Sequence, residues 1–417
     1  MGSFSRAGSA SGKAPCVACC RADHAKDDEL SKASTARIAA LTGGRVPPNA
    51  APAPSATADT PSARVNSDCA QQARTLAPIV ARFDRYREAL PSARAAADLN
   101  ELGDKSGDEP SGKPCLTRLP VDAERLNAAL GMPPDAIKPL QLRNDETGFR
   151  AALYRDEGTG RMILVPRDTQ PDSLVDWQAN TRNGLGLDTP QYAAMRKLTE
   201  RLVANDQTFD LAGYSKGGGI AQEGGLMNTL AQVRVFNSAG LADSSLSRTG
   251  QPNFESLVSR TRAFSSEGDF LTFMNNTTDP GQNIINSRFL RQELAGQGPG
   301  LNPINIKVRN PAMRGANDAQ FGRDKQAYID ELDQHIESMQ TAFDSGGVVQ
   351  SFPPVRAASK ETIADSMTLA GKMLGARSDQ PTLGKLAQHK MGVVLDSMEA
   401  NVANDRSALN AFLAKCG

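Results

Sequence analysis

The sequence predicts a mixed α/β fold with a mostly parallel central sheet, preceded by a disordered tail and a small helical segment. From residue 140 onwards, apolar runs of strand length alternate with helical patterns, which is typical of a parallel sheet. Residues 66–139 carry apolar residues at helical spacing. Residues 1–65 are rich in Ala, Ser, Pro, Gly and Thr, so they bury too little apolar surface to offset their conformational entropy. We therefore expect disorder over 1–65 and a folded catalytic domain over 140–417.

Local patterns justify the elements in order. The stretch 148–168, GFRAALYRDEGTGRMILVPRD, predicts two strands joined by a glycine-containing turn. Thr189 and Pro190 are typical of the start of a helix, as N-cap and first-turn residue. The predicted elements are helices over 66–99, 121–130, 189–205 and 216–232, and strands over 208–215, 233–240 and 260–270. Functional loops of such a sheet follow the carboxyl ends of its strands.

Composition excludes several classes of function. Lys+Arg and Asp+Glu are equal at 47 each, so the basic excess typical of a nucleic-acid binder is missing. No apolar run approaches the roughly 20 residues that span a bilayer, and the N-terminus lacks the apolar core of a secretory signal. We expect synthesis as a soluble cytoplasmic chain, with export only by a route that reads no such signal.

The six cysteines leave the redox compartment open. One cluster has the spacing C-x-x-C-C-x-x-x-H and consists of Cys16, Cys19, Cys20 and His24. It is half of a zinc-like signature, and no second pair lies at the right distance. We therefore expect reduced thiols in a loose tail and no metal or other cofactor. In an oxidising compartment, a disulfide between Cys69 and Cys115 is the alternative.

Residues 213–217 read G-Y-S-K-G and fit the pattern G-x-S-x-G. A predicted strand precedes the pattern and a predicted helix follows it, the context in which it presents a nucleophilic serine on a strained turn. The hydroxyl of Ser215 would lie at a helix N-terminus, where backbone N–H groups favour developing negative charge. The sequence therefore predicts Ser215 as a nucleophile. The alternative is a glycine-rich turn with an incidental serine.

A nucleophilic serine needs a base, and the base is oriented by a carboxylate. His389 precedes a helical pattern near the C-terminus and gives the chain order serine, acid, histidine, so we favour it as the base. His335 lies beside the apolar face of a long predicted helix and is the competitor, whereas His24 lies in the predicted tail.

The favoured acid is Asp269, which follows the strand residues TRAFSSEG (261–268) at their carboxyl end and precedes the apolar FLTFM. Asp243 follows the strand directly after the serine and is too near it in the sheet. Asp279, in NNTTDPGQ, has the sequence of an ordinary turn.

Four segments together resemble the class 3 lipases, which are α/β-hydrolases that cleave acyl esters. They are ILVPRDTQPDSLVDWQAN (163–180), LAGYSKGGGIA (211–221), AFSSEGDFLT (263–272) and QHKMGVV (388–394). The resemblance covers roughly residues 140–417, with an unmatched stretch in the middle. It implies an α/β-hydrolase fold and two oxyanion donors, Thr169 and the backbone N–H of Lys216.

The sequence also departs from that family. Asp168 stands where the family has glycine and puts a carboxylate beside the implied oxyanion site. Tyr214 replaces a histidine and Lys216 a leucine. The charge of Lys216 either attracts anionic lipid head groups or faces solvent. Trp177 is interpreted as a packing residue, and residues 276–325 as either a lid or a structural loop.

The motifs, the tail and the missing signal also resemble bacterial secreted phospholipase effectors, including those of type VI secretion systems. This resemblance implies a phospholipase A-type activity on lipids at a membrane surface, and a secretion-system component or an immunity protein as partner. Two other hypotheses stay open. One is acyl transfer by the same triad, and the other is a non-catalytic hydrolase-fold protein that binds a partner through its N-terminal helices.

Overall fold

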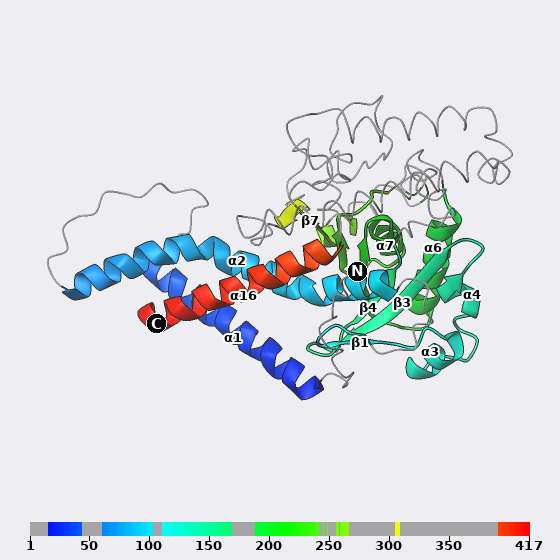
Figure 1. Cartoon of the computed structure of the whole chain (residues 1–417), viewed down its shortest axis with the longest axis horizontal. Helices are drawn as coiled ribbons and strands as arrows, with labels where there is room; N and C mark the ends of the chain where they lie inside the picture. The colour runs from blue at the N-terminus through cyan, green and yellow to red at the C-terminus, as the bar shows by residue number, and fades with distance from the viewer. Residues whose placement is uncertain are drawn as a thin grey trace, which may run out of the picture.

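The computed structural model describes residues 16–43, 61–102, 111–168, 188–241, 245, 248, 256–257, 259–266, 305–308 and 391–417. These residues build a mixed sheet with helices on both faces (Figure 1). The helices are α1 (Val17–Thr42), α2 (Pro61–Leu102), α3 (Ala123–Ala129), α4 (Pro139–Leu142), α6 (Pro190–Ala204), α7 (Lys216–Met227) and α16 (Met391–Cys416). The strands are β1 (Leu116–Arg118), β2 (Arg143–Asn144), β3 (Phe149–Asp156), β4 (Met162–Pro166), β5 (Phe209–Tyr214), β6 (Val233–Phe236), β7 (Thr261–Ser266) and β8 (Asn305–Val308). None of the helices in this described part is long and apolar enough to cross a membrane.

The sheet is mostly parallel, as the sequence predicts. Its strand order is β1-β3-β4-β5-β6-β7-β8, and β2 pairs with β3. The β1–β3 and β3–β4 pairs are antiparallel, whereas every pair from β4 to β8 is parallel. The carboxyl ends of β4, β5, β6 and β7 therefore lie along one side of the sheet, which we call the carboxyl edge. This is the side where open α/β sheets place their sites.

The predicted turn between β3 and β4 is held by Asp156. Its carboxylate accepts the Gly158 N–H at 3.1 Å and the Thr159 hydroxyl at 2.5 Å, and Gly160 completes the turn at φ 75°. The predicted helix start at Thr189 is also confirmed, because its side chain accepts the Tyr192 N–H at 3.2 Å. Both features follow from turn and capping chemistry that is local in sequence.

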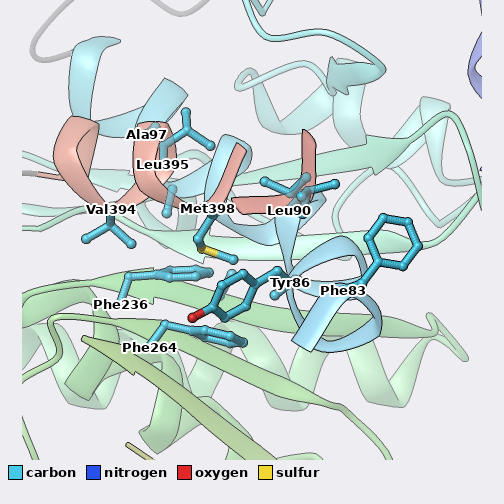
Figure 2. Close-up of a cluster of buried hydrophobic side chains, with 14 of the residues drawn as sticks. Phe83, Tyr86, Leu90, Ala97, Phe236, Phe264, Val394, Leu395 and Met398 are labelled. Atoms are coloured by element: carbon cyan, nitrogen blue, oxygen red, sulfur yellow. The ribbon is translucent and has the colours of Figure 1, made fainter. Parts of the chain in front are cut away.

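Two apolar clusters cover the two faces of the sheet. On one face, α6 and α7 pack Met195, Leu198 and Ile220 against β4, β5 and β6. On the other face, α2 and α16 pack against the sheet, and Figure 2 shows Val394, Leu395 and Met398 of α16 beside two strand phenylalanines. These are Phe236 and Phe264, whose stacked rings have centroids 5.5 Å apart. The first turns of α16 therefore lie over the ends of β6 and β7.

Helices α1, α2 and α16 form a bundle that extends beyond the sheet, so segments from both ends of the chain lie side by side (Figure 1). Ion pairs join the three helices at several levels. Arg406 pairs with Asp27 at 2.7 Å, Arg94 with Glu399 at 2.9 Å, and Arg82 makes two bonds to the buried Asp405. The predicted domain boundary at residue 139 stays a prediction, although one apolar cluster joins residues from both sides of it.

The prediction of a disordered tail is wrong for residues 17–42, which form α1. The helix has few large apolar side chains, so its hydrophobic pattern is weak and the composition of the surrounding segment dominates a prediction from sequence. Tertiary contacts stabilise it instead, because Leu30 and Ile38 join the bundle core. In addition, the Ser31 hydroxyl donates to Asp84 of α2 at 2.8 Å. Tertiary packing commonly outweighs weak local propensity in this way.

The expectation of reduced thiols is also wrong, because all six cysteines are paired. The disulfides are Cys16–Cys19, Cys20–Cys115 and Cys69–Cys416. The alternative pairing of Cys69 with Cys115 is wrong too, since each has a different partner. The zinc-like cluster has no thiol left to bind a metal, and the described residues contain no group of three or more His, Cys, Asp or Glu suited to one. Connectivity of this kind cannot be deduced from cysteine spacing.

Loss of the Cys69–Cys416 disulfide should lower the free energy of unfolding by about 2–4 kcal/mol, because a cross-link over a long loop restricts the unfolded chain. The bond joins residues 347 positions apart. Denaturant melts of Cys69→Ser and Cys416→Ser measure the loss. The matched control is Cys16→Ser, which opens a loop of sequence separation 3 and should cost much less. An equal loss of unfolding free energy in Cys16→Ser and Cys69→Ser would contradict the expectation.

Candidate active site

Ser215 lies on a strained turn between β5 and α7. Its φ and ψ are 52° and −126°, a backbone conformation that a residue with a side chain adopts at a cost of about 1–3 kcal/mol. Backbone hydrogen bonds hold it there. The Ser215 N–H donates to the Phe236 carbonyl at 3.0 Å, and its carbonyl accepts the Ala239 N–H at 2.9 Å. The strand–turn–helix context expected for this serine is therefore present.

Glycines at both ends of the turn allow the chain to pass itself closely. A Cβ on Gly213 would lie 2.2 Å from the Gly217 carbonyl oxygen. A Cβ on Gly217 would lie 2.6 Å from the Pro166 carbonyl oxygen and 3.1 Å from the Arg167 carbonyl carbon. Any side chain at either position would force the backbone apart. The first turn of α7 therefore packs directly against the end of β4, and this contact requires glycine.

Lys216 is buried, with 3% of its side chain exposed. The interpretation that its charge faces solvent is therefore wrong, whereas the attraction of anionic lipid head groups stays a prediction. It begins α7, so its backbone N–H belongs to the helix N-terminus beside Ser215. A buried ammonium is stable only with polar partners. The chain therefore uses this lysine within the structure.

A second set of contacts fixes the segment after β6 against α7. Asn237 has a positive φ of 41° and donates its N–H to the Phe264 carbonyl at 2.8 Å. The Gln222 side chain of α7 donates to the Ser238 hydroxyl and the Ala239 carbonyl, both at 3.0 Å. Because Ala239 also bonds Ser215, these contacts support the serine turn. Sequence reasoning missed them, and an Asn-Ser pair directly after an apolar strand is the one signal available.

A buried carboxylate of α7 binds two arginines from other segments of the chain. Glu223 of α7 is fully buried and accepts from Arg196 of α6 at 2.5 Å and from Arg248 at 2.9 Å. Both arginines also pair with Asp188, at 2.7 and 3.4 Å. This ionic cluster was not predicted, because its members are spread over four segments of sequence.

The cluster depends on its charges. Burial alone would raise the pKa of Asp188, but the hydrogen bond of Arg196 and the charges of Arg196 and Arg248 outweigh it, so this pKa lies below its ordinary value of 3.8. A lowered carboxyl pKa stabilises the fold above that ordinary value. The contribution of Asp188 to stability is therefore complete at neutral pH and is lost as the pH falls through the lowered value.

Asp168, the departure from the lipase pattern, is buried at the end of β4 with 7% exposed. Its Oδ2 accepts a hydrogen bond of 2.5 Å from the Asn100 side chain of α2. The Asp168 carboxylate is therefore bound to a helix that lies on the N-terminal side of the predicted domain boundary at residue 139. This contact was not predicted from the sequence.

The other predicted site residues lie outside the described residues: Thr169, Asp269, His389, the competitors Asp243, Asp279 and His335, and Trp177. Their neighbours in sequence are described. Asp168 directly precedes Thr169, and β7 ends at Ser266, three residues before Asp269. Helix α16 begins at Met391, two residues after His389. Asp168 follows β4 by two residues and Ser266 ends β7, so both lie at the carboxyl edge. The first turns of α16 pack beside Phe236 and Phe264 of β6 and β7 (Figure 2).

Residues 102–322 match the family of the Tle-like phospholipase domain. The matched region is just over half of the chain. The chain belongs to this family. The resemblance to bacterial phospholipase effectors drawn from the motifs is thereby confirmed. No curated protein matches the chain. The Tle-like region includes Ser215 and Asp168 but ends before His335 and His389, so it does not distinguish the two candidate bases.

Replacement of Gly217 by alanine should destabilise the protein by about 1–3 kcal/mol, because overpacking forces the backbone to move. Here the methyl group would meet the Pro166 carbonyl oxygen. The matched control is Gly392→Ala in α16, where a Cβ meets nothing within 4 Å; this change should stabilise the helix by up to about 1 kcal/mol. Thermal melts of both variants measure the difference, and a Gly217→Ala variant as stable as the control would contradict the close approach.

Proposed function

We propose that the protein is a serine hydrolase that cleaves carboxylic esters of phospholipids, with Ser215 as nucleophile, His389 as base and Asp269 as acid. One observation carries the proposal. A non-glycine residue, Ser215, has a strained backbone at a strand-to-helix turn, in a chain that belongs to the Tle-like phospholipase domain family. Strain of this kind persists where the surrounding structure enforces it, and it is concentrated at active sites.

In the proposed reaction, the Ser215 Oγ attacks the ester carbonyl carbon while His389 takes the hydroxyl proton. The carbonyl oxygen becomes an oxyanion and accepts hydrogen bonds from the N–H groups of Lys216 and Thr169. Collapse of the intermediate expels the lysolipid alcohol, which receives the proton from His389. A water then attacks the acyl-serine, and His389 again accepts and returns a proton, so that fatty acid and free serine are formed.

The packing of α16 supports His389 as the base. This helix starts two residues later, and its residues Val394 and Leu395 lie in the cluster with Phe236 and Phe264. The start of α16 therefore lies beside the carboxyl ends of β6 and β7. The opposite end of the helix, at Cys416, is bonded to the far end of α2.

The strand order supports Asp269 as the acid. The strand β7 pairs with β6, and β6 pairs with the serine strand β5. An acid three residues beyond the end of β7 therefore starts from the same edge as Ser215, two strands further along. Asp243 follows β6, the direct neighbour of β5, and has less distance in which to accommodate a histidine between acid and serine.

The three disulfides support an oxidising working compartment, which fits an exported effector that meets its lipids outside the cytoplasm. We further propose a phospholipase A-type activity at a membrane surface, and a secretion-system component or an immunity protein as partner. Acyl transfer is the alternative, in which an alcohol other than water attacks the acyl-serine. A non-catalytic partner-binding role is disfavoured by the maintained strain at Ser215.

Ser215→Ala should abolish labelling by an active-site fluorophosphonate and lower phospholipid hydrolysis by about a thousandfold or more. Both follow because no other group would form the covalent bond. Gel fluorescence and fatty-acid release measure them. The matched control is Ser259→Ala, an exposed serine whose hydroxyl bonds the Ser256 carbonyl at 2.8 Å; it should behave as the wild type. Labelling that persists in Ser215→Ala would exclude this nucleophile.

His389→Ala should remove turnover, whereas His335→Ala should retain it, because only one histidine can accept the serine proton. Rates of fatty-acid release from phospholipid vesicles compare the two variants. His24→Ala is the control, since His24 lies on α1 and contacts Asp28 there at 3.5 Å. Activity that survives in His389→Ala and vanishes in His335→Ala would reverse the assignment.

A further inference from the structure

We propose that Asn100 of α2 is a positioning residue for ester cleavage, which acts by holding the Asp168 carboxylate and with it the end of β4 beside the serine turn. The inference rests on the proposed function of Ser215. It assigns a role in the site to helix α2, which lies almost entirely outside the Tle-like region that begins at residue 102.

The contact itself is short and charge-assisted. The Asn100 Nδ2 donates to the Asp168 Oδ2 at 2.5 Å, and Asp168 is 7% exposed. Hydrogen bonds to an ionised acceptor are roughly twice as strong as those between neutral groups. A buried carboxylate that loses a donor also becomes more costly to keep charged. The bond therefore restrains the Oδ2 atom of this carboxylate.

Asp168 lies next to the nucleophile turn through the backbone. A Cβ added to Gly217 would lie 3.1 Å from the carbonyl carbon of Arg167. This carbon is bonded to the amide nitrogen of Asp168. The Arg167 N–H still donates to the Arg150 carbonyl of β3 at 2.8 Å. Sheet pairing therefore extends to Arg167, and the Asn100 bond holds the residue that follows.

The direction of this carboxylate matters because an oxyanion forms at the same edge. A negative charge turned toward a developing oxyanion raises the barrier, whereas a charge bound to an amide donor on the opposite side is partly compensated. In this chain the carboxylate comes together with a donor from α2.

Asn100 is itself held in place by buried contacts one half-turn earlier on α2. Asp98 accepts from the Tyr154 hydroxyl of β3 at 3.0 Å and from Arg118 of β1 at 2.7 Å. Burial, followed by the charge of Asp98, raises the pKa of Tyr154 well above its ordinary value, so the hydroxyl keeps its proton and remains a donor. The last turn of α2 is therefore fixed to the sheet, and Asn100 presents its amide from a rigid support.

The test compares Asn100→Ala with Arg94→Ala, which removes a different α2 contact, the 2.9 Å pair with Glu399. We expect Asn100→Ala to slow fluorophosphonate labelling of Ser215 and to lower kcat on phosphatidylethanolamine–phosphatidylglycerol vesicles by about tenfold or more, with KM within about twofold. Arg94→Ala should keep the wild-type rates. Thermal melts of the two variants control for general loss of stability.

The exchanged pair, Asn100→Asp with Asp168→Asn, restores a carboxylate–amide hydrogen bond with donor and acceptor reversed. It should recover part of the labelling rate that Asn100→Asp loses, which a merely structural effect of residue 100 would not produce. Labelling by Asn100→Ala at the wild-type rate, or an exchanged pair no faster than Asn100→Asp alone, would overturn the role.

Hydrogen exchange separates this inference from the proposed function, because it requires no substrate. If Asn100 holds this edge, Asn100→Ala should accelerate exchange at the amides of residues 167, 168 and 216–218 and leave that of β6 unchanged. Unchanged exchange at these amides would overturn the inference even in an active enzyme. A wild type that neither labels nor hydrolyses would instead overturn the proposed function, while the exchange data still decide the contact.

Discussion

The approach of α7 to the end of β4 is the constraint on which the carboxyl edge depends. Backbone meets backbone there, with Gly217 leaving no room for a side chain beside the Pro166 carbonyl. This contact brings three features together: the strained Ser215, the first N–H groups of α7, and Asp168. The strain is local, but what offsets it is not. The Phe236 carbonyl of the neighbouring strand accepts the Ser215 N–H, and the Ala239 N–H after that strand donates to the Ser215 carbonyl. The turn therefore keeps its shape only while the sheet is assembled.

The two faces of the sheet contribute in different ways. On the α7 face, small residues allow close packing, and one buried carboxylate, Glu223, gathers the charges. On the other face, the core is made by helices from the two ends of the chain. Each of their ion pairs has at least one partly exposed partner, and such pairs are weak evidence for stability. Apolar burial and the disulfides are therefore the main stabilising terms of the bundle. Chain ends that are usually dispensable are therefore part of the support of the site.

Local chemistry made much of the fold predictable. The turn at Asp156, the cap at Thr189 and the glycine spacing around Ser215 each act over a few residues, and each was found as expected. The features that were missed depend on distant partners. Helix α1 is stabilised by contacts with α2 and α16, Lys216 is enclosed by the fold, and Asn100 meets Asp168 across 68 positions. The triad partners Asp269 and His389 remain predictions from their order in the chain and from the elements beside them.

The Cys69–Cys416 bond has a consequence for how the protein travels. Once it forms, the chain from Cys69 to Cys416, with a sequence separation of 347 and with Ser215 inside it, is one covalent ring. A linear chain passes through a narrow channel one residue at a time, but a ring passes only as two strands abreast. Any route that threads the unfolded chain must therefore act before oxidation, whereas a route that carries folded cargo is indifferent to it. The timing of a single cross-link thus separates two kinds of transport.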